Sequence, residues 1–154
     1  MRAMVEQELL ERVKEMDPYE FEDLILSLLE KMGYGSVERT LKSNDGGVDG
    51  IVNQDQLGLD RIYMQVKRFN DQNVRETHIR DFIGAMSGDT MKGIFVTTSA
   101  FDRKAVDKAK YAHHKIVLID VRRLAELLYN HGVGVQVRTS LAIKSMDKDF
   151  FGIN

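Results

Sequence analysis

Hydrophobic and polar residues alternate along this chain with a helical period in several segments. Apolar residues recur three and four positions apart from Phe21 to Met32, which predicts an amphipathic helix. Asp17 and Pro18 suit the cap and the first turn of this helix, and Gly33 suits its end. The same spacing predicts further helices at residues 5–15, 75–87, 102–112 and 121–131.

Other segments have the pattern of β-strands. Three of them come early in the chain, and the second and third of these alternate apolar and polar side chains. Two later segments are almost continuously apolar, as in strands buried within a parallel sheet. Strands are predicted at residues 36–43, 47–53, 61–68, 93–98 and 115–119, with a last edge strand at residues 134–139. The order of these elements predicts an α/β fold, in which a mixed β-sheet has helices on both faces and right-handed crossovers.

The composition narrows the class of protein. A chain of 154 residues that is 43% hydrophobic and 30% charged is typical of one globular domain. No stretch approaches the roughly 18 consecutive apolar residues of a membrane span, and the N-terminus lacks the apolar region of a signal peptide. The absence of cysteine excludes disulfides, thiol catalysis and zinc sites built from cysteine. These features favour a cytoplasmic protein with no membrane partner.

The charge balance bears on nucleic acid as a partner. A formal net charge of -2 argues against strong non-specific affinity for DNA. Four cations nevertheless fall within 14 positions of one another, namely Lys67, Arg68, Arg75 and Arg80. The net charge alone therefore does not exclude a nucleic-acid enzyme.

Candidate chemistry lies in two of the predicted strands. Alternation along residues 61–68 places Gln65 and Lys67 on one strand face, which Asp49 of the preceding strand could share. The Asp49 carboxylate, the Gln65 amide oxygen and the Val66 backbone carbonyl are hard oxygen ligands that suit Mg²⁺. The Lys67 ammonium could bind an attacking water or stabilise phosphate charge. A turn aspartate and an ordinary exposed strand face explain the same pattern without catalysis.

Other polar residues each allow two interpretations, one functional and one structural. Glu22 lies beside the apolar stripe of its predicted helix, where it either points towards the metal or is an ordinary solvated glutamate. Asp45 either approaches the metal or belongs to a turn with the glycines that follow it. Residues 97–99 end a buried strand where the next helix begins, and a helix cap is favoured there over phosphate binding. Neighbouring His113 and His114 diverge, which favours exposed histidines over metal ligands.

Several motifs follow one another in a recognisable order. They stand at residues 19–22, 32–34, 45–50, 65–68, 79–85, 92–98, 118–120 and 143–151. With them, most of the chain resembles the catalytic domain of the Mrr-type restriction endonucleases, a branch of the PD-(D/E)xK nuclease superfamily. The resemblance implies a restriction-endonuclease-like core and a Mg²⁺-dependent deoxyribonuclease, with Mn²⁺ as a substitute. Its implied substrate is double-stranded DNA that is modified or methylated, as in type IV-like restriction.

The resemblance also implies roles for particular residues. Asp49 is then the main metal ligand, Gln65 holds the second acidic position of the motif, Lys67 is the catalytic lysine, and Glu22 supports the metal site. Val48 stands where the superfamily often has proline. Because Gln65 replaces a carboxylate, we expect weaker metal binding, with compensation from Glu22 or Asp45.

The resemblance bears on organisation and partners as well. Mrr-type proteins commonly join this domain to an N-terminal winged-helix module that recognises DNA. We expect residues 1–16 to be a lead-in helix or linker remnant, and residues 17–154 to be the catalytic domain, with the recognition module missing from this chain. We expect Arg68, Arg75 and Arg80 to contact DNA, and cleavage of both strands favours a homodimer. A junction-resolving or repair nuclease, and a catalytically silent DNA-binding module, are the alternative functions.

Overall fold

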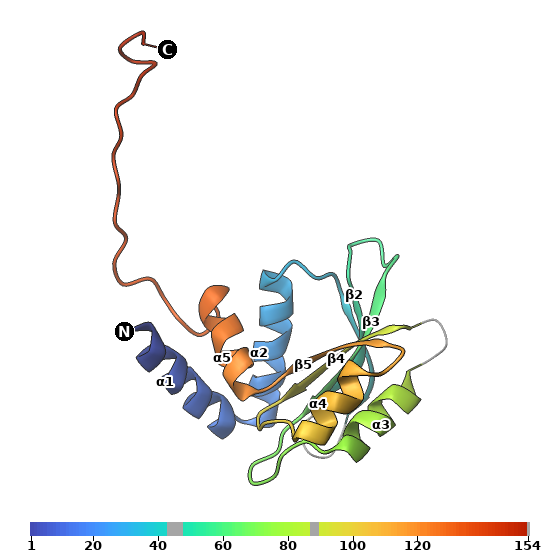
Figure 1. The fold of residues 1–154 in the computed structure, drawn as a ribbon. Coiled ribbons are helices and arrows are strands. Elements are labelled where there is room, and N and C mark those ends of the chain that lie inside the picture. The colour runs from blue at the N-terminus through green and yellow to red at the C-terminus, as the bar shows by residue number, and fades with distance from the viewer. Residues whose placement is uncertain (43–47, 87–89, 154) are drawn as a thin grey trace.

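A mixed five-stranded sheet forms the centre of the protein (Figure 1). The computed structural model describes residues 1–42, 48–86 and 90–153. The strands are β1 (Val37–Lys42), β2 (Val48–Asn53), β3 (Arg61–Lys67), β4 (Lys92–Thr97) and β5 (Lys115–Ile119), and they lie side by side in that order. β1, β2 and β3 are antiparallel neighbours, whereas β3, β4 and β5 are parallel. The mixed sheet and the α/β class predicted from the sequence are confirmed.

Helices cover both faces of this sheet (Figure 1). They are α1 (Arg2–Glu15), α2 (Pro18–Lys31), α3 (Glu76–Ala85), α4 (Arg103–Lys110) and α5 (Val121–Asn130). Buried residues of α1, α2 and α5 form one core with the sheet, and those of α3 and α4 form a second core on the opposite face. None of the helices in the described ranges is long and apolar enough to cross a membrane.

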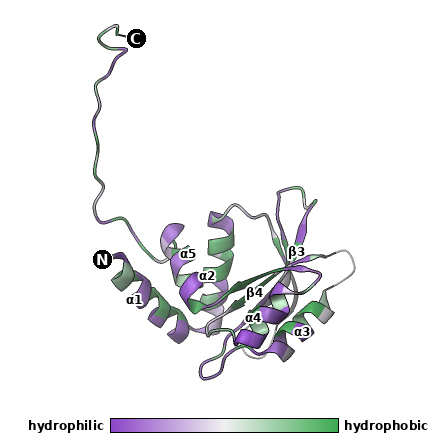
Figure 2. Cartoon of the chain, viewed as in Figure 1, coloured by the Kyte–Doolittle hydropathy of each residue, from purple (hydrophilic) through white to green (hydrophobic). Residues whose placement is uncertain are grey.

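Alternation along β3 assigns its side chains to the two cores. Met64 and Val66 belong to the core beneath α2 and α5, and Tyr63 belongs to the core beneath α3 and α4, where its ring meets that of Phe82. β4 is buried almost throughout and is coloured as hydrophobic, whereas α4 shows hydrophilic residues (Figure 2). Because side chains alternate, Gln65 and Lys67 lie on the same face as Tyr63.

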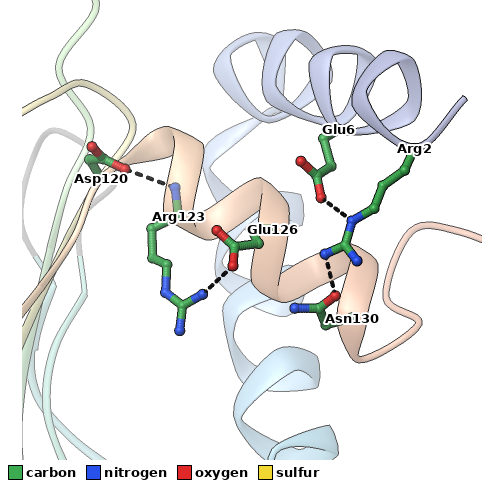
Figure 3. A network of polar contacts seen from close by, with 6 residues as sticks. All are labelled: Arg2, Glu6, Asp120, Arg123, Glu126 and Asn130. Carbon is green, nitrogen blue, oxygen red and sulfur yellow. Dashed lines mark hydrogen bonds and ion pairs between the residues drawn. The ribbon is translucent and has the colours of Figure 1, made fainter.

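The first helix is packed into the body of the protein. Val13 is only 2% exposed and joins the core that α2 and α5 share. At the other end of α1, the Arg2 guanidinium donates to the Asn130 side-chain oxygen at 2.6 Å (Figure 3). The same guanidinium lies 4.6 Å from the centre of the Tyr129 ring. α1 is therefore held to α5 at both ends.

The chain beyond α5 leaves the body and extends away from the sheet (Figure 1). Residues 134–139 are not a strand, so the edge strand predicted there is wrong for the single chain. A β-strand needs a neighbour for its backbone groups, and none of the described strands lies beside this segment. Most side chains from residue 136 to residue 153 are exposed as a result.

Candidate functional site

The antiparallel pairing of β2 with β3 brings the predicted ligands together. Asp49 lies directly opposite Gln65 in the register of these strands. Directly opposed residues project to the same face, with Cβ atoms about 4.5–5.5 Å apart. Lys67 follows two positions later on that face, beside Thr97 of the parallel neighbour β4. Asp49, Gln65 and Lys67 are all half-buried, so they are sheltered but reachable from solvent.

The start of α2 is fastened to the end of β3, next to Lys67. The Arg68 guanidinium donates to the backbone carbonyl of Met16 and lies 5.2 Å from the centre of the Phe21 ring. Glu22 follows Phe21 and is half-buried, with its Oε1 atom shielded from solvent. α2 therefore carries Glu22 to the same end of the sheet as Lys67, although this helix covers the opposite face.

The negative charge of Asp49 affects the pKa of Tyr63, which lies on the same face of the sheet. The pKa of the Tyr63 phenol is raised, first because burial disfavours the phenolate and then because Asp49 adds a negative charge nearby. One carboxylate oxygen of Asp49, Oδ1, is also shielded from solvent. A partly buried negative charge attracts a cation more strongly than one in bulk water, because the effective dielectric constant is lower.

The donor set at this place suits a hard cation with few protein ligands. Among the described residues, no group of three or more His, Cys, Asp and Glu side chains could hold a metal. Asp49 and Gln65 offer a carboxylate and an amide oxygen on one face, and the Val66 carbonyl lies between Gln65 and Lys67 in the chain. Mg²⁺ accepts one or two carboxylates and keeps several waters, so this donor set fits it. Asp45, weighed as a further ligand, lies outside the described residues.

The three predicted DNA contacts differ in their surroundings. Arg68 is half-buried and holds Met16 and Phe21, which favours a structural role for it. Arg75 and Arg80 are exposed at the start and middle of α3. This helix covers the sheet face that carries Asp49, so both cations lie on the side of the candidate site.

A groove of about 680 Å³ lies between α3 and α4, which the sequence did not indicate. It is lined on one side by Arg80 and on the other by Lys104, Lys108 and Tyr111, and it reaches His113 and His114. Only contacts between separate helices create this groove, so no local pattern reveals it. His113 is exposed as predicted, and His114 is half-buried.

Residues 97–99 have another role than the predicted helix cap. Thr98 Oγ1 accepts from the Phe69 backbone N–H at 3.1 Å and donates to the Phe69 carbonyl at 3.2 Å. Ser99 Oγ donates to the Gln72 carbonyl at 2.7 Å. These hydroxyls fasten the loop that follows Lys67 to the end of β4, and Asp102 occupies the cap position of α4 instead.

Comparison with known proteins gives one family and one fold. A family model for the Mrr catalytic domain, described as restriction endonuclease, matches residues 13–128. The type IV methyl-directed restriction enzyme EcoKMrr of Escherichia coli (strain K12) is 36% identical over 156 residues, which cover 98% of this chain and 50% of that protein. The chain thus spans about half the length of this relative.

Two solved structures share the fold. The DNA modification-dependent restriction endonuclease AspBHI superposes with a TM-score of 0.65 at 22% identity, over 84% of this chain and 36% of the other. The MspJI restriction endonuclease in complex with a 27-mer oligonucleotide gives a TM-score of 0.55 at 17% identity, over 82% of this chain and 31% of the other. The mixed sheet with helices on both faces is therefore a restriction-endonuclease-like fold.

Proposed function

The chain belongs to the Mrr-type restriction endonuclease family, and we propose that it is the part of a type IV-like enzyme that hydrolyses phosphodiester bonds of modified double-stranded DNA. The observation that carries the proposal is the direct opposition of Asp49 and Gln65, with Lys67 on the same face. The names of the relatives support the substrate, since they describe methyl-directed and modification-dependent restriction.

Asp49, Gln65 and the Val66 carbonyl would hold Mg²⁺ or Mn²⁺ at this place. The bound cation would neutralise phosphate charge and supply an activated water. Glu22 would add negative charge from α2, where one of its oxygens is shielded from solvent. This donor set has a neutral amide where a second carboxylate could stand, so we expect the site to need a higher metal concentration than a site with two carboxylates.

Lys67 would act on the reacting groups directly. Its ammonium can hydrogen-bond the attacking water and offset negative charge on the phosphoryl oxygens as the new P–O bond forms and the old one breaks. The hydroxyls of Thr98 and Ser99 would act through position only, since they hold the loop after Lys67 against the end of β4. Lys67 itself is the last residue of β3, where it pairs with Thr97 of β4, so its backbone is fixed by the sheet.

DNA would approach the face that α3 and α4 cover. Arg75 and Arg80 are exposed on α3, and Lys104 and Lys108 line the groove beside it. Such cations bind phosphate groups without reading sequence, so they would position the duplex and would not themselves recognise a modified base. Concerted cleavage of both strands would favour two copies of the site acting together.

The test is cleavage of methylated and unmethylated plasmid with Mg²⁺ or Mn²⁺. We expect Asp49→Asn and Lys67→Ala each to reduce the rate by on the order of 10²–10⁴-fold. Asp71→Asn and Lys110→Ala, which change exposed residues of the same types, should keep the activity. Glu22→Gln should lower the rate, because the half-buried Glu22 supports the site. Asp23→Asn, which changes its exposed neighbour, is the matched control and should keep the activity.

The alternatives give different results in the same assay. Cleavage that survives both Asp49→Asn and Lys67→Ala would exclude this site, provided that circular dichroism shows folded variants. DNA binding without cleavage by the unsubstituted protein would indicate a silent DNA-binding module. Preference for three-way or four-way junctions over linear duplex would indicate a resolving nuclease. Titration calorimetry with Mn²⁺ on the Asp49→Asn variant tests metal binding separately from activity.

A further inference from the structure

The segment after α5 has the side-chain pattern of a strand with one buried face. Its odd-numbered residues are mostly β-branched or apolar, and its even-numbered residues are polar or small. The odd-numbered residues are Val135, Val137, Thr139, Leu141 and Ile143, and the even-numbered ones are Gln136, Arg138, Ser140, Ala142 and Lys144. Period-two alternation over ten positions is a strong strand signal.

The single chain leaves this segment without a place in its described sheet. Val137, Leu141 and Ile143 are 83%, 84% and 89% exposed, respectively. The segment extends away from the body (Figure 1), and residues 134–139 are not assigned to any strand. We call residues 135–144 the arm. An apolar stripe of this kind is typical of a strand with one face covered by another surface.

The edge strand β5 offers such a surface. β5 pairs with β4 on one side, and none of the described strands lies on its other side. Val117 in the middle of β5 is 47% exposed. It borders a pocket of about 150 Å³ between α2, α5 and the sheet, lined mainly by apolar residues that include Ile25, Leu28 and Leu127. An open sheet edge beside apolar residues is a template for an added strand.

The topology of the sheet disfavours pairing of the arm with β5 of its own copy. α3 and α4 connect successive parallel strands on one face of the sheet, and α5 lies on the other face. A parallel strand that followed α5 and lay beyond β5 would therefore have a crossover of the opposite hand to those two. Such crossovers are right-handed in about 98% of cases. This rule disfavours the addition of the arm to its own sheet as a parallel strand.

We propose that the arm of one copy pairs as an additional strand with β5 of a second copy. The odd-numbered stripe would then cover Val117 and the neighbouring pocket, and the even-numbered residues would face the other way. If both copies exchange their arms, the same contacts form twice about a two-fold axis and no sheet edge stays open at β5. The arm exchange depends on the fold and not on catalysis, so it can be tested independently of the proposed nuclease activity.

The first test measures association of the full chain by sedimentation at roughly 1–100 µM. We expect a dimer, and we expect Val137→Lys combined with Leu141→Lys to raise its dissociation constant at least about tenfold, because two lysines would enter an apolar interface. The matched control, Gln136→Lys with Ser140→Lys, adds the same charge to the opposite side of the arm and should leave the constant within about threefold. A monomer at the highest concentration, or an unchanged dimer in the first variant, would overturn the proposal.

The second test asks which copy the arm reaches. The chain has no cysteine, so introduced cysteines form the sole thiols. Copies with Val117→Cys are mixed with copies that carry one cysteine in the arm, at Val137, Thr139 or Leu141. We expect a disulfide-linked pair of copies for at least one position, and none when Val106→Cys, on exposed α4, replaces Val117→Cys. When both cysteines stand in one chain, a disulfide that closes within the monomer would overturn exchange between copies.

Discussion

At the scale of single residues, Gln65 determines how much negative charge the candidate site holds. It lies directly opposite Asp49, so the two ligand candidates face each other on adjacent strands. An amide oxygen can coordinate a cation but does not attract it over distance as a carboxylate does. The position is therefore a natural place to measure how charge controls metal binding in this fold.

We predict that Gln65→Glu tightens metal binding. The added carboxylate supplies a second anionic oxygen on the strand face of Asp49, so the Mn²⁺ concentration at half-saturation should fall by about tenfold, or about 1.4 kcal/mol. Titration calorimetry measures this directly. Gln56→Glu, which places the same charge in the exposed loop between β2 and β3, should change it little. Equal affinities of the Gln65→Glu variant and the unsubstituted protein would place Gln65 outside the cation's ligand shell.

Tyr63 links the same site to stability at high pH. Its pKa is raised above the ordinary value of 10.0 in the folded protein, by burial and then by Asp49. The neutral phenol therefore contributes stability that is fully present below about pH 10 and is lost as the pH rises through the folded-state pKa, because the unfolded chain releases its proton first.

We accordingly predict that Tyr63→Phe flattens the pH dependence of unfolding. Urea denaturation at about pH 8 and about pH 11 should show a smaller loss of stability for this variant than for the unsubstituted protein. Tyr111→Phe, which changes a residue that is 78% exposed, should retain the original slope. Identical slopes for Tyr63→Phe and the unsubstituted protein would contradict the assigned cause.

At the scale of helices and strands, local patterns predicted most of the fold. α2 begins and ends where Asp17, Pro18 and Gly33 indicated, and Asp17 accepts the N–H groups of Tyr19 and Glu20 as a cap. The opposition of Asp49 and Gln65 agrees with the two predicted neighbouring strands. These features depend on residues close in sequence, so the sequence carries their signal.

Features that depend on distant partners were not predicted. The bond from Arg68 to Met16 spans 52 positions, and Thr98 binds a loop 29 positions away. The prediction of an edge strand at residues 134–139 was wrong for a related reason. The side-chain pattern specifies one buried face but not which sheet covers that face. Local periodicity does not say which strand edge accepts another strand.

Contact between α3 and β4 gives a prediction at the same scale. A Cβ atom on Gly93 would stand 2.1 Å from Met86 Cε and 2.8 Å from Phe82 Cζ. Gly93→Ala should therefore cost about 1–3 kcal/mol through overpacking, as measured by urea denaturation. Gly84→Ala in α3 meets nothing within 4 Å and should add about 0.5–1 kcal/mol. A neutral Gly93→Ala would mean that the Met86 side chain moves away freely.

At the scale of the whole molecule, the helices form two layers around one sheet, and α1 belongs to one of them. Leu9, Leu10 and Val13 pack into the core that α2 and α5 share. The division into a lead-in segment, residues 1–16, and a catalytic domain, residues 17–154, stays a prediction. The shared core means that each segment contributes to the folding stability of the other. A boundary at residue 16 would cut through a common core.

We predict that Val13→Ala destabilises the entire protein. The side chain is 2% exposed, so its loss should lower the free energy of unfolding by about 1.5–3 kcal/mol in one cooperative urea transition. Met4→Ala on the same helix removes a side chain that is 71% exposed and should change stability by less than about 0.5 kcal/mol. An effect confined to local melting of α1, with the main transition unchanged, would support a separate lead-in segment.

The order of strands in the sheet also has a consequence for synthesis. Each strand from β2 onwards lies beside the strand that immediately precedes it in the chain. As the polypeptide leaves the ribosome, each strand from β2 onwards therefore finds its neighbour already made, and no later strand has to be inserted between two earlier ones. Growth of this sheet proceeds in one direction and finishes at β5, so the last edge made is the one exposed when translation ends.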